Sequence, residues 1–239
     1  MEILKGKTFV ITGASKGIGR ALAEALSLHN TNLVLIARSK SALEQVQQIA
    51  IANGSNCTIF CGNITDEQFV NNAVKESQLQ FGQINFLINN AGFGIFKDTE
   101  KISAAEWDDV FATNAKGTFL MSKAAIPFMK AQQFGHIINI ASDVAKRVFA
   151  GGSLYCASKY AQDAFSMAIR KELRPFKVKV SVVYSGLVDS SFHAEPQGDN
   201  SHGQWLKNED MANAIIYIAA QPPHVVIDEL MIHPTFQDY

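Results

Sequence analysis

The sequence predicts an α/β protein in which a doubly wound parallel β-sheet lies between two layers of helices, a three-layer αβα arrangement. Short segments rich in Val, Ile and Phe alternate with helical patterns along the whole 239-residue chain. These segments are mostly apolar on both faces, as strands covered by helices on both sides must be. No repeat, low-complexity run or Pro/Ser-rich linker interrupts the alternation. Right-handed βαβ crossovers then join the strands into one sheet, so we expect a single domain over residues 1–239.

The strands are predicted from apolar runs. They fall at Thr8–Ile11, Asn32–Ala37, Cys57–Cys61, Ile84–Asn89, His136–Ala141, Lys177–Val183 and Val225–His233. Helix starts are predicted at capping boxes: Ser41 with Glu44, Ser103 with Glu106 and, more weakly, Thr65 with Gln68. Three glycines lie where these helices are expected to stop, namely Gly54, Gly82 and Gly135.

One irregular stretch stands out near the end of the chain. It runs from Asp189 to Gln204 and contains Pro196, Gly198 and Gly203. A polar excursion of this length in a single-domain α/β protein is more often a lid than a linker. We therefore expect a substrate lid around residues 189–205.

Composition excludes several classes of function. Lys and Arg number 21 against 22 Asp and Glu, a net charge of -1, so we expect no nucleic-acid partner and no anionic membrane surface. No signal peptide or membrane-spanning run is recognisable, which predicts a cytoplasmic protein.

Cys57, Cys61 and Cys156 are too few for a disulfide framework. Cys57 and Cys61 resemble half a zinc site, but no second pair follows at ligand spacing, so we expect ordinary buried thiols and no metal.

A glycine-rich turn directly follows the first strand, and a helical pattern begins at Arg20. Glycines here let the backbone approach a pyrophosphate, and the helix N-terminus supplies free N–H groups and partial positive charge. This is the phosphate-binding turn of a Rossmann fold; the alternative is a purely structural glycine turn. The predicted cofactor contacts in it are Gly13, Ser15, Lys16, Gly17, Ile18 and Gly19.

The end of the second strand indicates which dinucleotide binds. A carboxylate there would bind the ribose 2′-hydroxyl of NAD, but this chain has Arg38, followed by Ser39 and Lys40. A guanidinium matches a phosphate well, and Lys16 in the glycine turn could reach the same group. The prediction is NADP(H). The alternative is that Arg38 is a solvated charge stacked on the adenine.

Tyr155 and Lys159 lie four residues apart in a helical pattern that ends near Arg174. Residues at this spacing share one helix face. An ammonium beside a phenol favours the phenolate, so Lys159 is expected to lower the pKa of Tyr155 and suit it to proton transfer. Such a pair alone is common by chance.

The motifs gain weight from their order. The glycine turn, Asn89–Gly92, Asn114, Ser142 and the Tyr155/Lys159 pair follow one another along nearly the whole chain. In this order and spacing the sequence resembles the short-chain dehydrogenase/reductase family. The resemblance implies that Tyr155 is the acid/base and that Lys159 holds the nicotinamide ribose. It also implies that Ser142 stabilises charge on the substrate oxygen and that Asn114 holds a relay water at a local helix break.

Further cofactor contacts are implied by the same resemblance. They are Asn63, Ile64, Asn90, Ala91, Gly92, Gly186, Val188 and Ser190. Asn63 stands where the family often has an adenine-contacting Asp. The sequence also departs from the family at Ser185–Gly186, where Pro-Gly is usual, and the loss of proline's fixed φ is expected to loosen that turn. The C-terminus, Ile227–Tyr239, lacks the Gly-rich ending of acyl-carrier-protein reductases.

The substrate pocket is expected to be walled by Asp143–Gly152, Phe93, Tyr184 and the lid. Phe93, Phe149 and Phe192 make it apolar if they face inward; the alternative for each is a purely structural packing role. Lys146 and Arg147 either attract an acidic substrate or form an exposed charge pair. His193 and His202 are expected to be solvated rather than catalytic.

These observations predict an NADPH-dependent oxidoreductase that reduces a ketone or aldehyde carbonyl, a small-molecule substrate, and oxidises the alcohol in reverse. A 3-oxoacyl-thioester (acyl-carrier-protein) reductase is the alternative within the enzymes. A non-catalytic NADP-sensing protein is the alternative outside them. By family resemblance the helices Lys116–Phe134 and Tyr155–Arg174 are expected to form a homodimer or homotetramer interface.

Overall fold

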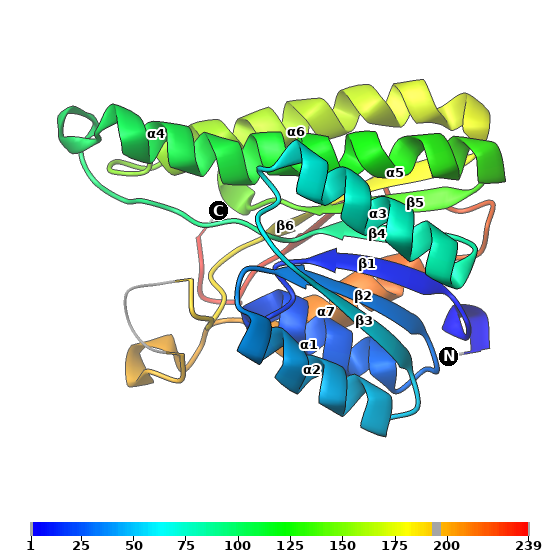
Figure 1. Ribbon diagram of the computed structural model, residues 1–239. Helices are drawn as coiled ribbons and strands as arrows, with labels where there is room; N and C mark the ends of the chain where they lie inside the picture. The colour runs from blue at the N-terminus through cyan, green and yellow to red at the C-terminus, as the bar shows by residue number, and fades with distance from the viewer. Residues whose placement is uncertain (1, 193–196, 239) are drawn as a thin grey trace.

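All seven strands of the structure, a computed structural model that describes residues 2–192 and 197–238, form one parallel sheet (Figure 1). The spatial order is β3-β2-β1-β4-β5-β6-β7. The strands are β1 (Thr8–Thr12), β2 (Asn32–Ala37), β3 (Asn56–Cys61), β4 (Phe86–Asn89), β5 (Gly135–Ile140), β6 (Val178–Ser185) and β7 (Glu229–Ile232). The doubly wound α/β fold is therefore confirmed. The order reverses between β1 and β4, and in such sheets the crevice at this reversal is where ligands bind.

Helices cover both faces of the sheet. They are α1 (Gly17–Ser27), α2 (Lys40–Ala52), α3 (Glu67–Phe81), α4 (Ala104–Phe111), α5 (Thr118–Gln132), α6 (Ser153–Leu173) and α7 (Asn208–Ala219). Figure 1 shows α1, α2 and α7 on one face and α3, α5 and α6 on the other. Each layer has its own buried apolar cluster against the sheet. Within the described residues no helix is long and apolar enough to cross a membrane.

The helix boundaries test the predicted caps. Ser103 and Glu106 form the expected capping box at the start of α4. The other two boxes are wrong: Ser39 precedes α2, and Asp66 caps α3 by accepting hydrogen bonds from the backbone N–H groups of Gln68 and Phe69. A carboxylate accepts such bonds more strongly than a hydroxyl, which explains the shift at α3.

The predicted helix stops are borne out in part. Gly82 ends α3 with φ +71°, and Gly54 follows the last residues of α2 with φ +93°. Gly135 instead opens β5, and Gln133 takes the left-handed conformation at the end of α5. A Cβ on Gly135 would lie 2.5 Å from the Met129 side chain, so close packing requires glycine there.

The predicted lid is anchored through Asp189. Its carboxylate accepts hydrogen bonds from the Gly198 N–H (2.8 Å), His202 Nδ1 (3.1 Å) and Lys207 Nζ (3.0 Å). His202 is therefore buried and stacked on Trp205, contrary to the expectation that it is solvated. Its ring provides a donor that a buried carboxylate needs. His193 and Pro196 lie outside the described residues.

Candidate active site

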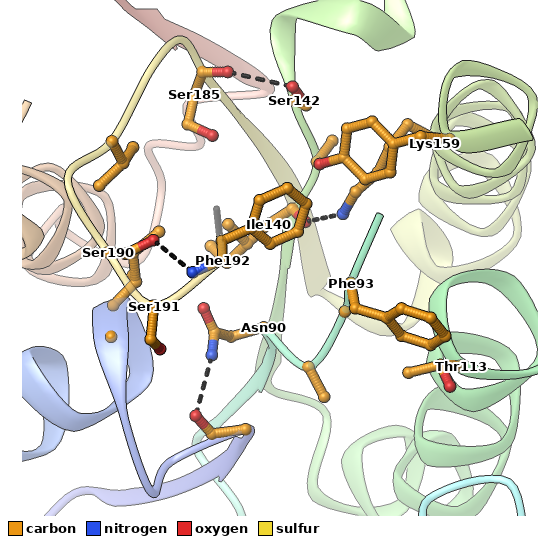
Figure 2. Close-up of a pocket in the computed structure, with 18 of the residues that line it drawn as sticks. Asn90, Phe93, Thr113, Ile140, Ser142, Lys159, Ser185, Ser190, Ser191 and Phe192 are labelled. Atoms are coloured by element: carbon orange, nitrogen blue, oxygen red, sulfur yellow. Dashed lines mark hydrogen bonds between the residues drawn. The ribbon is translucent and has the colours of Figure 1, made fainter. Parts of the chain in front are cut away.

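A cavity of about 940 Å³ opens at the carboxyl ends of the strands (Figure 2). Most of the residues predicted from the sequence line it: Gly13, Ser15, Lys16, Gly17, Ile18, Arg38, Ser39, Asn63, Ile64, Asn90, Ala91, Gly92, Ser142, Tyr155, Lys159, Gly186, Val188 and Ser190. Gly19 and Asn114 are not among the lining residues; each supports a lining segment from behind. The sheet therefore gathers segments that lie far apart in sequence into one site.

The glycine turn presents the start of α1 to the cavity. The helix begins at Gly17, three residues before the predicted start at Arg20, and Lys16 at the N-cap makes no side-chain capping hydrogen bond. The first N–H groups of α1 are thus left without a side-chain cap. Gly13 and Gly17 have φ values of +66° and +56°, and a Cβ on Gly19 would lie 2.4 Å from the Gly13 carbonyl oxygen. The geometry suits close approach of a pyrophosphate.

Asn90 ties this turn to the segment that follows β4. Its Nδ2 donates to the carbonyl oxygens of Thr12 (3.0 Å) and Gly13 (3.3 Å). In return, Thr12 Oγ1 accepts hydrogen bonds from the backbone N–H groups of Asn90 (3.0 Å) and Ala91 (3.1 Å). These four hydrogen bonds fix the turn after β1 against the segment after β4, the two strands between which the sheet order reverses.

The end of β2 lies at the far end of the cavity. Arg38 and Ser39 line it, and Ser39 at the N-cap of α2 makes no side-chain capping hydrogen bond. An exposed guanidinium beside an uncapped helix N-terminus is a donor set that fits a phosphate. Lys16 points elsewhere: its Nζ donates to the Ser191 carbonyl oxygen in the predicted lid (3.4 Å). Asn63 also lines the cavity, and its Oδ1 accepts a hydrogen bond from the Thr65 N–H (3.1 Å).

Three of the four side chains predicted to be catalytic meet where β5 ends against α6, and Asn114 is the fourth. Tyr155 and Lys159 lie one turn apart on α6, and Ser142 follows β5. Figure 2 shows Lys159 Nζ donating to the Ile140 carbonyl oxygen (2.8 Å) and Ser142 Oγ to that of Ser185 (3.2 Å). Lys159 also donates to Gln162 Oε1 (3.0 Å).

Burial shifts the pKa values of Tyr155 and Lys159 in opposite directions. It raises the pKa of Tyr155 above its ordinary value, although a hydrogen bond with Ser142 partly offsets the effect. It lowers the pKa of Lys159 to about 7. The expectation that Lys159 lowers the pKa of Tyr155 is therefore wrong for this structure. The lysine Nζ lies 5.9 Å from the centre of the phenol ring and is engaged by other acceptors, so desolvation dominates.

Asn114 lies in a π-helical turn, Ala112–Gly117, between α4 and α5. The predicted local helix break is thus confirmed. The side chain clamps the segment after β4: Nδ2 donates to the Phe93 carbonyl oxygen (2.9 Å) and Oδ1 accepts from the Phe93 N–H (3.0 Å). Nδ2 also donates to Ser158 Oγ on α6 (2.9 Å), so Asn114 joins both walls of the site.

Aromatic rings cover Tyr155 on the substrate side. The ring of Phe96 lies 5.4 Å from that of Tyr155, 5.9 Å from that of Phe149 and 6.1 Å from that of Phe192, between ring centres. Phe93, Phe149 and Phe192 line the cavity as predicted. The sequence interpretation missed Phe96, although its place three residues after Phe93 in the same loop is a signal that was present.

Other predicted wall residues have structural partners. Tyr184 is not among the lining residues; it is buried, and its hydroxyl donates to Asp163 Oδ1 (2.6 Å). Lys146 pairs with Asp163 (3.0 Å), and Arg147 lines the cavity but forms an ion pair with Asp143. Of the two alternatives for Lys146 and Arg147, attraction of an acidic substrate is therefore the less favoured, because both cations are paired within the protein. The partner carboxylates lie 17 and 4 residues away in sequence, and charges at such spacings are too ordinary a signal to reveal these pairs.

Gln237 and Asp238, near the C-terminus, also line the cavity. No motif marked them in the sequence. Among the described residues, no three His, Cys, Asp or Glu side chains are grouped to hold a metal ion.

The uncapped glycine turn, the basic end of β2 and the Ser142–Tyr155–Lys159 group define a class of protein, the oxidoreductases that bind a nicotinamide dinucleotide. Comparison with known proteins narrows the class. The chain matches the short chain dehydrogenase family over residues 7–200. It belongs to the short-chain dehydrogenase/reductase family, whose members use nicotinamide cofactors.

Two relatives illustrate the level of sequence similarity. An uncharacterized oxidoreductase of Staphylococcus aureus strain MRSA252 is 33% identical over 235 residues, which cover 98% of this chain and 100% of that protein. Glycine betaine reductase ATRR of Emericella nidulans is 34% identical over 239 residues, but the match spans 19% of its length.

Solved structures agree in fold. An alcohol dehydrogenase from the archaeon Thermococcus sibiricus, complexed with 5-hydroxy-NADP, has a TM-score of 0.92 and 29% identity, with 98% of each chain covered. The serine dehydrogenase of Escherichia coli has a TM-score of 0.86 and 27% identity over 97% of this chain and 100% of that one.

Proposed function

We propose that this protein is an NADP(H)-dependent oxidoreductase that reduces the carbonyl group of a ketone or aldehyde, with Tyr155 as the acid. The observation that carries the proposal is the meeting of Tyr155, Ser142 and Lys159 on the cavity that also contains the glycine turn. Proton donor and cofactor-binding groups thus share one enclosed space. The cofactor, when bound, supplies the hydride that reduces the carbonyl carbon.

The buried phenol suits proton donation. Because burial raises the pKa of Tyr155, the side chain stays protonated near neutral pH and has a proton to give to a carbonyl oxygen. Ser142 supplies a second donor for the same oxygen, an oxyanion-type role, once its one hydroxyl hydrogen turns to the substrate from Asp143 Oδ1 and the Ser185 carbonyl oxygen. A protonated Lys159 stabilises the phenolate left by proton transfer, and its pKa of about 7 lets it exchange a proton with solvent near neutral pH.

The preference for NADP(H) is supported by Arg38 and Ser39 beside the uncapped start of α2. Structures of relatives in this family, including the T. sibiricus enzyme, were determined with NADP-type ligands. The 2′-phosphate of NADP is the ligand group that this donor set fits and that NAD lacks.

The substrate is proposed to carry an apolar substituent beside its carbonyl. Phe96, Phe149 and Phe192 present aromatic surface next to Tyr155, and Arg147 is paired with Asp143. A 3-oxoacyl thioester remains the second substrate class, since its acyl chain also fits an apolar wall. Non-catalytic sensing of NADP(H) would require tight binding without turnover.

The test is an assay of NADPH oxidation with a panel of ketones and aldehydes and with an acetoacetyl thioester. Wild-type protein is expected to turn over the simple carbonyl compounds faster than the thioester. Tyr155→Phe is expected to lower kcat by roughly 10²- to 10⁴-fold, the usual contribution of general acid catalysis. Tyr217→Phe, at an exposed tyrosine on α7, is the matched control. Tyr155→Phe with full activity would refute the mechanism, and tight NADPH binding without turnover in wild-type protein would favour the sensor.

A further inference from the structure

The C-terminal segment returns to the cavity after β7 and places the Gln237 carboxamide between two parts of the site. Gln237 Oε1 accepts a hydrogen bond from the Leu187 N–H (2.8 Å) in the turn after β6. Gln237 Nε2 donates to Asp143 Oδ2 (2.9 Å) in the segment after β5. Both ends of one amide are thus used to join segments that the sheet alone leaves separate.

The turn after β6 is built for this approach. A Cβ on Gly186 would lie 2.3 Å from Gln237 Oε1 and 2.6 Å from His233 Cδ2, so any side chain there would displace both groups. Glycine at position 186 is therefore what lets the C-terminal segment reach the cavity.

The same turn lacks the proline that the family usually has before this glycine, because Ser185 occupies the position. The expected loosening is offset by contacts with other segments. The Gly186 N–H donates to the Ile232 carbonyl oxygen (2.8 Å), and the Leu187 carbonyl oxygen accepts from the Leu206 N–H (3.1 Å). The bond from Leu187 N–H to Gln237 completes the set. Hydrogen bonds to the tail here restrain a backbone that no pyrrolidine ring restrains.

The other end of the bridge reaches the neighbour of the predicted catalytic serine. Asp143 is buried, with 3% of its surface exposed, and its Oδ1 accepts a hydrogen bond from Ser142 Oγ (3.0 Å). Arg147 Nε donates to Oδ2 of the same carboxylate (2.9 Å), and His233 Nε2 lies 3.4 Å from it. A continuous path of hydrogen bonds thus runs from Leu187 through Gln237 and Asp143 to Ser142.

We propose that Gln237 is a positioning residue that couples the turn beside the nicotinamide site to Ser142. This inference rests on the proposed function, because it assigns to Gln237 the relative placement of the groups that the reaction uses. The residue itself need not touch the substrate. A carboxamide can join the two segments because its oxygen accepts a hydrogen bond from the Leu187 N–H while its nitrogen donates one to the Asp143 carboxylate.

Two substitutions separate hydrogen bonding from packing. Gln237→Met keeps the approximate volume but removes both bonds, and kcat is expected to fall by about tenfold at all pH values. Gln237→Glu keeps the acceptor but replaces the donor. The titratable and charged groups that face this position are Asp143, Arg147 and His233. When protonated, the introduced carboxyl group still donates to Asp143, whereas the ionised form repels it, so kcat is expected to decline as pH rises from about 5.5 to about 8.

A rescue variant and a control complete the design. In Asp143→Asn/Gln237→Glu the direction of the bond is reversed: the asparagine amide donates to the glutamate, and the single carboxylate left at this site, now at position 237, is the one available to Arg147. Activity lost in Gln237→Glu at about pH 8 is therefore expected to return in part. Thr235→Val, at an exposed position in the same segment, is expected to match wild-type protein. NADPH affinity, measured by fluorescence titration, is expected to change less than about twofold in Gln237→Met, because the glycine turn and Arg38 are untouched.

The outcomes distinguish this proposal from the proposed function. Full kcat in Gln237→Met, or an identical pH-independent loss in both single variants, would overturn the positioning role. Wild-type protein without carbonyl reduction would instead overturn the proposed function. Hydrogen exchange of the Leu187 amide needs no turnover: it is expected to be faster in Gln237→Met than in wild-type protein or Thr235→Val, and equal exchange would also overturn the bridge.

Discussion

At the scale of single residues, the chemistry of the site depends on how burial shifts the pKa of each ionisable side chain. Tyr155 and Lys159 are neighbours on one helix face, yet desolvation raises the pKa of the phenol and lowers the pKa of the ammonium to about 7. Asp143 and Asp163 remain buried beside cations, Arg147 and Lys146, which keep their charges compensated. Arg38 is exposed at the rim of the cavity, so water solvates its charge and no buried counter-ion is needed. Its guanidinium can therefore pair with a charged group of a ligand.

Arg38 is therefore the residue at which cofactor preference is tested. Arg38→Glu removes the guanidinium and introduces a carboxylate that repels a 2′-phosphate but accepts from a 2′-hydroxyl. The ratio of kcat/KM for NADPH to that for NADH is expected to fall by about 100-fold, in line with losing a charge-assisted hydrogen bond and gaining repulsion. Steady-state kinetics with both cofactors measures it. Arg20→Gln, in which the lost cation pairs with Glu24 on α1, is the control. An unchanged ratio in Arg38→Glu would show that Arg38 does not contact the phosphate.

At the scale of elements, breaks and pairings in regular structure position the site. The π-helical turn between α4 and α5 directs Asn114 at the backbone of Phe93, which an uninterrupted α-helix would not do. The pairing of β5 with β6 carries a buried polar contact, His136 Nε2 to Ser181 Oγ at 2.7 Å. Ser181 Oγ in turn donates to the Ile227 carbonyl oxygen (2.6 Å), which ties the segment before β7 to the sheet.

His136 makes stability depend on pH. Burial lowers its pKa to about 3, with a further contribution from Lys179, whereas the unfolded chain has the ordinary value of 6.5. Between these values the unfolded state binds the proton and the folded state does not, so folding stability is complete above about pH 6.5 and is lost as pH falls toward 3.

The prediction compares wild-type protein with His136→Asn in urea unfolding at about pH 7.5 and about pH 5. Wild-type protein is expected to be the more stable at the higher pH, and its advantage is expected to shrink by about 2 kcal/mol at the lower pH. The difference between the two proteins removes contributions from other titrating groups. An advantage of the same size at both pH values would contradict the assignment to His136.

At the scale of the whole molecule, strand order decides where the site lies, and the outer helices leave large apolar side chains exposed. The reversal of order between β1 and β4 brings the glycine turn beside Asn90, while β5 and β6 bring Ser142 beside Ser185. On the outer layer, α5 and α6 and the residues that follow α5 expose large apolar side chains: Phe119, Phe134, Tyr160 and Met167. The ring of Phe119 packs edge-on against that of Phe165, which joins the two helices into one surface.

We propose this α5/α6 face as the subunit interface of a homodimer or homotetramer. Light scattering at micromolar concentration is expected to give a mass of at least two chains. Phe119→Glu, which places a charge at a side chain 43% exposed on that face, is expected to shift the protein toward monomer. Leu79→Glu, exposed on α3, is the control. A monomeric wild-type protein would contradict the proposal.

Local patterns in the sequence predicted the parallel sheet, the glycine turn and the Tyr155/Lys159 pair, whereas the helix break at Asn114 and many of the other cavity-lining residues were implied by the family resemblance. The locally predicted features depend on residues close together in the chain: apolar runs reveal strands, the glycine turn adjoins its strand, and Tyr155 and Lys159 lie one helical turn apart. Where neighbours in sequence compete, as Thr65 and Asp66 do for the start of α3, the local signal was less reliable.

The tertiary structure alone decided which distant segments meet and how burial alters them. Gln237 contacts Leu187 and Asp143, which lie 50 and 94 residues away in sequence. Phe96 covers Tyr155, His202 is buried against Asp189, and Tyr155 and Lys159 are desolvated together. Each of these outcomes depends on the order of strands and the depth of burial, which are properties of the packed chain rather than of any one segment.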